Sequence, residues 1–273
     1  MQPTLPRPAD DAPACALGPD PAAVQAQVLR VYDRVAREPA AGFHFHVGAD
    51  HAVQRLGYDA AALARLPARA TARFAGVGHP FAAGRVPEGA TVLDHACGAG
   101  TDLLLAALQA GPGGRAVGVD LTSAMREVAS AAAAEAGLAD RVQVLAGSFD
   151  DLPLADASVD VVLSNGVLNL APDKPHVLRE ALRVLRPGGR LLLADVVLRR
   201  PLHEAARAQP ALWAACVGGA LTLDELLAAI GAAGFERLQV AAHHDCFGGA
   251  EVQFKLGDGL LAGAVTLSAR RPR

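Results

Sequence analysis

Apolar positions along this chain follow two spacings, which alternate from about residue 90 onward. Short apolar runs of the kind that form buried strands lie at 90–94, 115–119, 142–145, 159–164, 190–194, 237–242 and 264–269. Segments with apolar residues three and four apart, typical of amphipathic helices, lie between them at 102–109, 123–136, 176–185 and 222–233. This alternation predicts an α/β fold: a doubly wound, mainly parallel sheet of seven strands with helices on both faces. Pro187-Gly188-Gly189 is expected to end the helix at 176–185.

The first 85 residues follow a different pattern. Residues 1–20 hold five prolines and little apolar periodicity, which predicts a flexible leader. Apolar residues recur at helical spacing from 21 to 37, and short helical stretches follow up to about 74. We therefore expect a helical cap at 21–85 and a main domain at 86–273 that carries a lid insertion at about 200–222.

Composition narrows the class of protein. Hydrophobic residues make up 52% and charged residues 19%, as expected for a folded globular chain. The apolar runs are too short to cross a bilayer, and a net charge of −3 argues against nucleic acid as a partner. Only Arg270, Arg271 and Arg273 form a basic group, which we interpret as a solvated terminus. The four cysteines show no paired spacing and no export signal is apparent, so we expect reduced thiols and a cytoplasmic location.

A glycine-rich segment follows the strand at 90–94. It reads Asp94-His95-Ala96-Cys97-Gly98-Ala99-Gly100. Glycines 98 and 100 allow a tight turn and a close approach of the backbone to a ligand. The next strand ends near Asp120, twenty residues past Gly100, where a carboxylate can accept hydrogen bonds from both hydroxyls of a ribose. This arrangement suits NAD, FAD or an adenosyl cofactor.

Three details separate these cofactors. Leu103 stands where a dinucleotide site has its third glycine, which a pyrophosphate needs for close packing of the helix. Asp94 can bind an ammonium group and would repel a phosphate. The strand at 159–164 ends in Ser164-Asn165-Gly166. Together these details favour an adenosyl cofactor with a methionine tail.

Taken in order, the segments 92–101, 117–122, 147–160, 164–174 and 183–195 resemble the class I S-adenosylmethionine-dependent methyltransferases, in the ubiquinone/menaquinone-biosynthesis-like group. Segments 74–76, 119–122, 169–174 and 213–221 look like the arsenite methyltransferase branch of that family, which extends the resemblance to about 50–235. The resemblance implies a Rossmann-like sheet, the cofactor S-adenosylmethionine and transfer of a methyl group to a small molecule.

By position, the resemblance also implies which residues contact the cofactor. They are Tyr32, Asp94, Cys97, Gly98, Gly100, Asp120, Leu121, Phe149, Asp150, Asn165 and Leu168. Among them, Tyr32 would close over the cofactor, and Asn165 and Leu168 would lie beneath the sulfonium. Two positions depart from the family pattern. Ala96 replaces the first glycine of the loop, and Ser148 replaces an acidic residue that faces the adenine amino group.

A larger departure concerns the methyl acceptor. Arsenite methyltransferases hold trivalent arsenic with cysteine thiolates, which suit a soft centre. This chain retains Cys216 but has Val77 and Gly166 at the two other positions, so a three-thiolate site is not expected. Histidines are plentiful near the predicted acceptor site, and imidazoles can act as general bases. We take as candidate catalytic residues Cys216, His79, His44 and His46, and assign no metal ligands.

Four functions remain open from the sequence. The first is a methyltransferase for a soft thiol or metalloid acceptor. The second is an O-, N- or C-methyltransferase of a quinone or secondary metabolite. The third is a catalytically silent sensor that binds the cofactor. The fourth, a nicotinamide-dependent oxidoreductase, would use Asp120 in the same way but lacks a Tyr-x-x-x-Lys pair.

Overall fold

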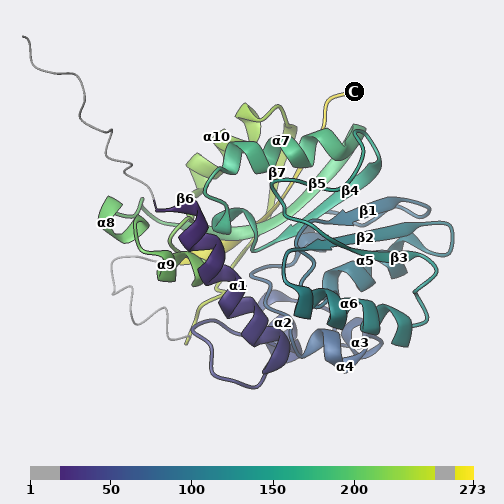
Figure 1. Ribbon diagram of the computed structural model, residues 1–273. Helices are drawn as coiled ribbons and strands as arrows, with labels where there is room; N and C mark the ends of the chain where they lie inside the picture. Colours follow the sequence, from purple (N-terminus) through teal and green to yellow (C-terminus); the bar gives the residue numbers. More distant parts are fainter. Residues whose placement is uncertain (1–18, 250–261) are drawn as a thin grey trace, which may run out of the picture.

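A computed structural model describes residues 19–249 and 262–273, so that the predicted leader at 1–20 lies almost wholly outside the described residues (Figure 1). One sheet runs through the molecule in the order β3-β2-β1-β4-β5-β8-β7. Its strands are β1 (Thr91–Asp94), β2 (Arg115–Asp120), β3 (Val142–Ala146), β4 (Val159–Asn165), β5 (Leu185–Leu198), β7 (Glu236–His244) and β8 (Ala262–Arg270). Strands β1 to β5 pair in parallel, and β8 runs antiparallel between β5 and β7.

The α/β class and the doubly wound sheet are confirmed, with one strand more than the predicted seven. The additional strand, β6 (Leu221–Thr222), pairs in parallel with the end of β5 at Val197 and Leu198. Two residues are too few to show a strand period, and so the sequence carried no signal for it.

Helices cover both faces of the sheet (Figure 1). Helices α5 (Thr101–Ala110) and α6 (Ser123–Glu135) pack on one face, and α7 (Lys174–Val184) and α10 (Leu223–Ala232) lie on the other. The N-terminal helices are α1 (Pro21–Arg37), α2 (Ala49–Leu56), α3 (Ala60–Ala64) and α4 (Ala68–Thr71). Within 19–249 and 262–273, none of the helices combines the length and the apolar run needed to cross a bilayer.

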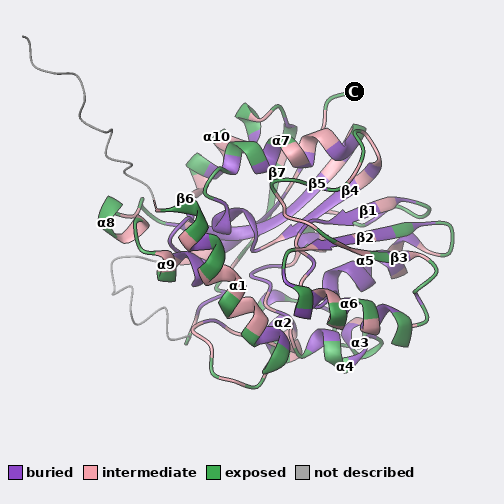
Figure 2. Ribbon diagram, in the orientation of Figure 1, coloured by how far each residue is buried: buried purple, intermediate pink, exposed green. Residues whose placement is uncertain are grey.

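The core lies along the central strands, which are buried on both faces (Figure 2). Val161, Val162 and Leu163 of β4 are each no more than 1% exposed, and Leu191 to Leu193 of β5 are equally buried. A parallel strand covered on both sides has no polar face, which explains why these segments are continuous apolar runs in the sequence. This rigid centre fixes the positions of the loops at the strand ends.

Strand β5 is much longer than predicted. Helix α7 ends at Val184, and the chain becomes extended at Leu185, before the glycine pair. The motif Pro187-Gly188-Gly189 therefore lies inside the strand and does not itself end the helix. Proline disfavours helical backbone in the residue before it, which is consistent with the early exit. A side chain at position 189 would come within 2.8 Å of the Arg186 carbonyl oxygen, so that glycine is needed there for close backbone packing.

The predicted lid at 200–222 contains two short helices, α8 (Glu204–Arg207) and α9 (Pro210–Ala214), followed by β6. Trp213 of α9 is 4% exposed, and its indole nitrogen donates a hydrogen bond to the Arg207 carbonyl at 2.7 Å. Helix α9 packs against α1, so that the cap and the lid meet over the carboxyl ends of the strands.

Candidate active site

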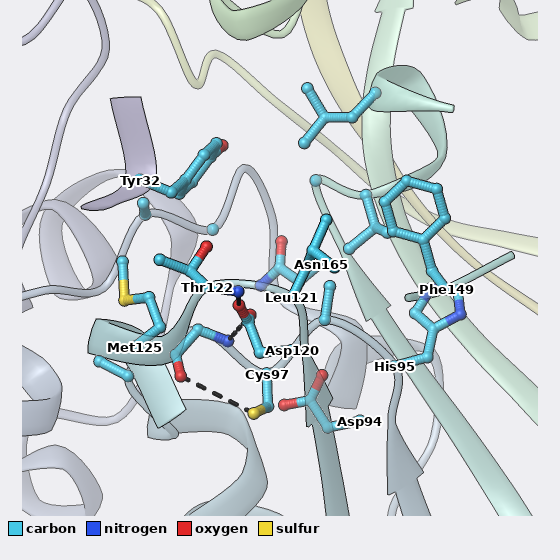
Figure 3. A pocket seen from close by; sticks show the side chains of 18 of the residues that line it. Tyr32, Asp94, His95, Cys97, Asp120, Leu121, Thr122, Met125, Phe149 and Asn165 are labelled. Carbon is cyan, nitrogen blue, oxygen red and sulfur yellow. Dashed lines mark hydrogen bonds between the residues drawn. The ribbon is translucent and has the colours of Figure 1, made fainter. Parts of the chain in front are cut away.

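A cavity with an empty volume of about 920 Å³ lies at the carboxyl ends of β1, β2 and β4, beneath α1 (Figure 3). The residues that were predicted to contact the cofactor and that line this cavity are Tyr32, Asp94, Cys97, Gly98, Asp120, Leu121, Phe149 and Asn165. Tyr32 reaches the cavity from α1, across from Asp94 and Cys97 (Figure 3).

The loop after β1 turns through two left-handed glycines. Gly98 has φ of 50°, and its N–H donates a hydrogen bond to the Asp120 carboxylate at 2.8 Å. The Thr122 N–H donates to the same carboxylate at 2.8 Å. Asp120 thus connects the glycine loop to the start of the segment that enters α6. Both φ values, 50° and 93° at Gly100, favour glycine because other residues are strained there.

Three predicted contact residues do not line the cavity. A side chain at Gly100 would meet the Ala129 Cβ at 3.2 Å, so this glycine allows α5 and α6 to pack closely. Leu168 is 2% exposed and lies in the core, where its N–H donates to Asp195 at 2.7 Å. Asp150 is exposed, and its carbonyl accepts a hydrogen bond from His176 at 2.7 Å. In each case a residue next to it in the sequence lines the cavity instead: Ala99 and Thr101 beside Gly100, Val167 beside Leu168, and Phe149 beside Asp150.

Three carboxylates line the cavity, and none of them forms a salt bridge within the described residues: Asp94, Asp102 and Asp120. Burial raises the pKa of all three above the usual range for aspartate, and for Asp94 the neighbouring Asp102 and Asp120 raise the pKa further. Such a group of desolvated acids favours a cationic ligand, since a positive charge would compensate their burial.

The cavity wall also includes a cationic residue that sequence reasoning missed. Arg73 lines its wall, with its guanidinium held by the carbonyls of Ala36 and Arg69. It is a cation available for a ligand carboxylate. No motif marks Arg73, and its position depends on the packing of the short helix α4, so a search for motifs could not have found it.

Asn165, at the end of β4, holds the loop at 76–78 against the sheet. Its side-chain oxygen accepts hydrogen bonds from the N–H groups of Val77 and Gly78 at 2.9 and 3.2 Å. Its amide nitrogen donates to Asp102 at 2.8 Å, and the Tyr58 hydroxyl donates to Asp102 at 2.7 Å. Tyr58, Asp102 and Asn165 therefore form one network that joins the N-terminal cap to the first turn of α5 and to the end of β4.

The raised pKa of the Asp102 carboxyl leads us to expect that the stability of the protein depends on pH. Burial raises its pKa to about 6, above the ordinary 3.8, so between these values the folded protein binds more protons than the unfolded chain. Its contribution to stability is therefore unfavourable at pH 7 and becomes more favourable as the pH falls through 6. We expect the difference in unfolding free energy between parent and Asp102→Asn to shift toward the parent by about 1–1.5 kcal/mol from pH 7.5 to pH 5.

Urea unfolding of both proteins at the two pH values measures this shift. Glu180→Gln is the matched control, because salt bridging to Arg183 lowers the pKa of Glu180 and the same pH change should not favour its parent. A difference between parent and Asp102→Asn that stays constant across the range would contradict the assignment.

The candidate catalytic residues lie outside the cavity wall. Cys216 is 2% exposed with φ of 62°, and its sulfur lies 3.6 Å from the Tyr32 hydroxyl. Burial raises the pKa of its thiol to about 12, so it is protonated at neutral pH. Tyr32 is thus the side chain that separates Cys216 from the cavity.

The histidines predicted to surround the acceptor also lie off the wall. His44 and His46 are bonded through Nε2 to the carbonyls of Ala214 and Gly248 at 3.3 and 3.0 Å. His79 packs on Tyr58 with ring centroids 4.1 Å apart, and burial lowers its pKa to about 4. The expectation that these three surround the acceptor is therefore not supported by their positions. In the described parts of the chain, no three or more His, Cys, Asp or Glu side chains gather in a way that would hold a metal ion.

His95 is the histidine that does line the cavity, although its place in the glycine loop suggested only packing. It lies beside Phe149, with ring centroids 6.5 Å apart, and neither ring nitrogen has a partner among the described residues (Figure 3). Burial lowers its pKa to about 4, so the ring is neutral at pH 7.

Comparison with known proteins places this geometry in a family. The sequence profile of a methyltransferase domain matches residues 87–258. A crystal structure of an arsenic (III) S-adenosylmethionine methyltransferase from Chlamydomonas reinhardtii is similar, with 33% identity, a TM-score of 0.63, and coverage of 78% of this chain and 72% of that one. The chain belongs to the S-adenosylmethionine-dependent methyltransferase family.

Curated members of the family include an arsenite methyltransferase of Halobacterium salinarum, 39% identical over 222 residues, which are 80% of this chain and 56% of the relative. The chain spans about half the length of the curated relatives that it matches. The fold is also shared with the [4+2]-cyclase SpnF, at 21% identity and a TM-score of 0.60 over 93% of this chain and 97% of that one.

Proposed function

We propose that the protein transfers a methyl group from S-adenosylmethionine to a small molecule. The observation that carries the proposal is the set of desolvated carboxylates Asp94, Asp102 and Asp120 around one cavity, without a salt-bridge partner in the described residues. The cofactor carries two positive centres, an ammonium and a sulfonium, which would compensate these negative charges. A dinucleotide would instead bring phosphates toward the acids, so the charge of the cavity supports the adenosyl cofactor.

Each wall of the cavity suits one part of that cofactor. Asp120 would accept hydrogen bonds from the ribose hydroxyls, as in other folds with an acid at the end of the second strand. Asp94 would bind the ammonium and Arg73 the carboxylate of the methionine tail. Leu121 and Phe149 offer apolar surface to the adenine ring.

Bound S-adenosylmethionine would supply an electrophilic methyl carbon. Asp94, Asp120 and Arg73 would hold it with that carbon available to an acceptor bound beside it. The protein's part is alignment and exclusion of water. Tyr32 and Phe74 line the cavity on the cap side, and the network at Asn165 fixes the 76–78 loop beside them.

We propose a soft acceptor, a thiol or a trivalent metalloid, as the first candidate class. The similarity to arsenite methyltransferases and the retained Cys216 support this class. A second class, an oxygen, nitrogen or carbon acceptor on a quinone-like or other organic molecule, is supported by the apolar wall formed by Val28, Met125, Val167 and Leu170. Gly166 lines the same wall at a position where arsenite methyltransferases have a cysteine, so this wall provides no thiol there.

Turnover assays distinguish the two classes. We expect purified protein with S-adenosylmethionine to methylate arsenite in the presence of thiol, measured by mass spectrometry of the product. Cys216→Ser should lower that rate at least tenfold, because Cys216 is the retained thiol proposed to bind the soft acceptor. It should leave S-adenosylhomocysteine affinity unchanged, because Cys216 does not line the cofactor cavity. Cys97→Ser is the positive control expected to change that affinity, since its thiol lies in the glycine loop that lines the cavity. Methylation of quinols alone would support the second class, and no product with any acceptor would leave only cofactor binding.

We also propose the three-part organisation of a leader at 1–20, a cap at 21–85 and a main domain from 86 with a lid at about 200–222. The start of the profile match at 87 and the contact between α1 and α9 support this division. A cytoplasmic location is part of the proposal and is supported by the free thiols of Cys97, Cys216 and Cys246.

A further inference from the structure

A second hollow lies on the sheet, well away from the cofactor cavity. It has an empty volume of about 540 Å³ and is lined by Ala83, Arg190, Arg237, Gln239, Ser268 and Arg270. The pairing of β4 with β5 shows where the hollow lies relative to the cavity. Asn165 of the cavity pairs with Ala194 of β5, and Arg190 lies four residues earlier on that strand. The hollow therefore lies toward the opposite end of the sheet, away from the carboxyl ends of the parallel strands.

Strand pairing brings the arginines together. Arg190 of β5 lies directly opposite Arg270 of β8. On the same face, two residues back along β8, Ser268 lies opposite Gln239 of β7. The register of β7 and β8 shifts between Glu236 and Gln239, and Arg237 within this irregularity has φ of 54°, a left-handed conformation that is strained for a residue with a side chain. The bulge turns a third guanidinium toward the pair.

The charges of this hollow are poorly compensated. Like charges directly opposite one another destabilise an antiparallel pair, and partial burial together with Arg270 lowers the pKa of Arg190. Arg190 donates to the Arg85 carbonyl at 2.6 Å and Arg270 to the Gly188 carbonyl at 3.4 Å, and both of these acceptors are neutral.

Anionic groups near the hollow are few. Glu236 lies 3.7 Å from Arg237, but both side chains are largely solvent-exposed, so this pair is weak. No carboxylate of the described residues lines the hollow itself. The chain as a whole has a net charge of −3, so this concentration of positive charge is local. Arg270 is the last residue of strand β8 and is exposed, so the basic group of the solvated terminus begins inside the sheet.

We propose that this hollow binds a phosphate group, with Arg190, Arg237 and Arg270 as its cationic ligands. Guanidinium groups match the oxygens of a tetrahedral phosphate in a forked geometry, and converging forks would remove the repulsion between the arginines. The Ser268 hydroxyl and the Gln239 amide add neutral donors. Such a site has no part in the proposed methyl transfer and is independent of it.

Calorimetric titration with inorganic phosphate and with pyrophosphate, at an ionic strength held constant with sodium chloride, tests the site. We expect saturable binding that Arg190→Gln and Arg270→Gln each weaken at least tenfold. Arg186→Gln is the matched control, because Arg186 lies on the same strand, outside the hollow, and is paired with Asp160 at 2.7 Å. That variant should bind both anions as the parent does. Binding of phosphate as well as pyrophosphate indicates a site for a free anion, whereas binding of pyrophosphate alone indicates a ligand with linked phosphates.

Two readouts make the test decisive. Circular dichroism and S-adenosylhomocysteine affinity should be unchanged in all three variants, which separates this site from the fold and from the proposed function. Absence of saturable binding of either anion by the parent would overturn the proposal. If Arg186→Gln weakened anion binding as much as Arg190→Gln, the proposal would also be overturned, because the anions would then be attracted by the general positive charge of the surface and not by this hollow. Binding of a duplex oligonucleotide without binding of either small anion would overturn it in favour of a nucleic-acid surface.

Discussion

Replacing Asp120 with alanine is expected to weaken the binding of S-adenosylhomocysteine about 100-fold or more. Its carboxylate accepts hydrogen bonds from the N–H groups of Gly98 and Thr122, each at 2.8 Å, and still faces the cavity. The substitution would remove the proposed acceptor of the ribose hydroxyls and would also release the glycine loop. Two hydrogen bonds to a charged group contribute about 3 kcal/mol together, which corresponds to about 100-fold in affinity.

Calorimetric titration of the two proteins measures this loss. Asp140→Ala is the matched control, because Asp140 is exposed in the turn between α6 and β3 and should leave the affinity unchanged. Unfolding curves should show that both variants fold. An Asp120→Ala protein that binds within about threefold of the parent would remove the proposed role of this carboxylate.

Gly219→Ala is expected to lower the free energy of unfolding by about 3 kcal/mol or more. A Cβ at this position would overlap the Asn169 carbonyl oxygen and the ring of Trp213. The overlapped oxygen belongs to the backbone and cannot swing aside, and the Asn169 N–H is itself held by Asp195. Overpacking at a buried site without room to relax is among the largest effects of a single substitution. The lid would have to move away from the cavity to accommodate the methyl group.

Urea unfolding measures this loss, and a second glycine supplies the control. Gly231 lies inside α10, and a Cβ there would have no atom within 4 Å. Gly231→Ala should therefore stabilise the protein by about 0.5–1 kcal/mol through helix propensity. If Gly219→Ala proved as stable as the parent, the lid would not pack as closely on η2 (Leu168–Leu170) as described here.

The residues that the sequence predicted best are those next to a strand end. Asp94, Gly98 and Asp120 follow directly from the positions of β1 and β2, because the carboxyl ends of parallel strands meet at one edge. For a residue that directly follows a strand, its position in the sequence therefore almost determines its place at that edge of the sheet. The roles of these residues toward the cofactor remain predictions, and their presence around one cavity makes those roles testable.

Two residues whose positions depend on contacts between distant segments, Tyr58 and Asp102, were missed. They come from separate parts of the chain and meet the predicted Asn165 only through hydrogen bonds. The histidines illustrate the converse. His44 and His46 lie in a segment that was expected to be near the acceptor, yet backbone carbonyls of α9 and of the segment after β7 bind their rings. The hydrogen-bond partner of a side chain depends on which distant segment packs against it. The spacing of residues along the sequence does not predict that contact.

Periodicity and glycine placement were thus sufficient for the fold class, for the order of the main strands and helices, and for the edge of the sheet at which the cavity lies. Those features follow from local preferences of the backbone and from apolar faces that must be buried. The composition of the cavity wall, the exclusion of Cys216 from it and the cluster of Arg190 with Arg270 required the folded chain. They arise where strands pair and helices pack across long separations in sequence, and the free energy of those contacts depends on shapes and charges that meet only after folding.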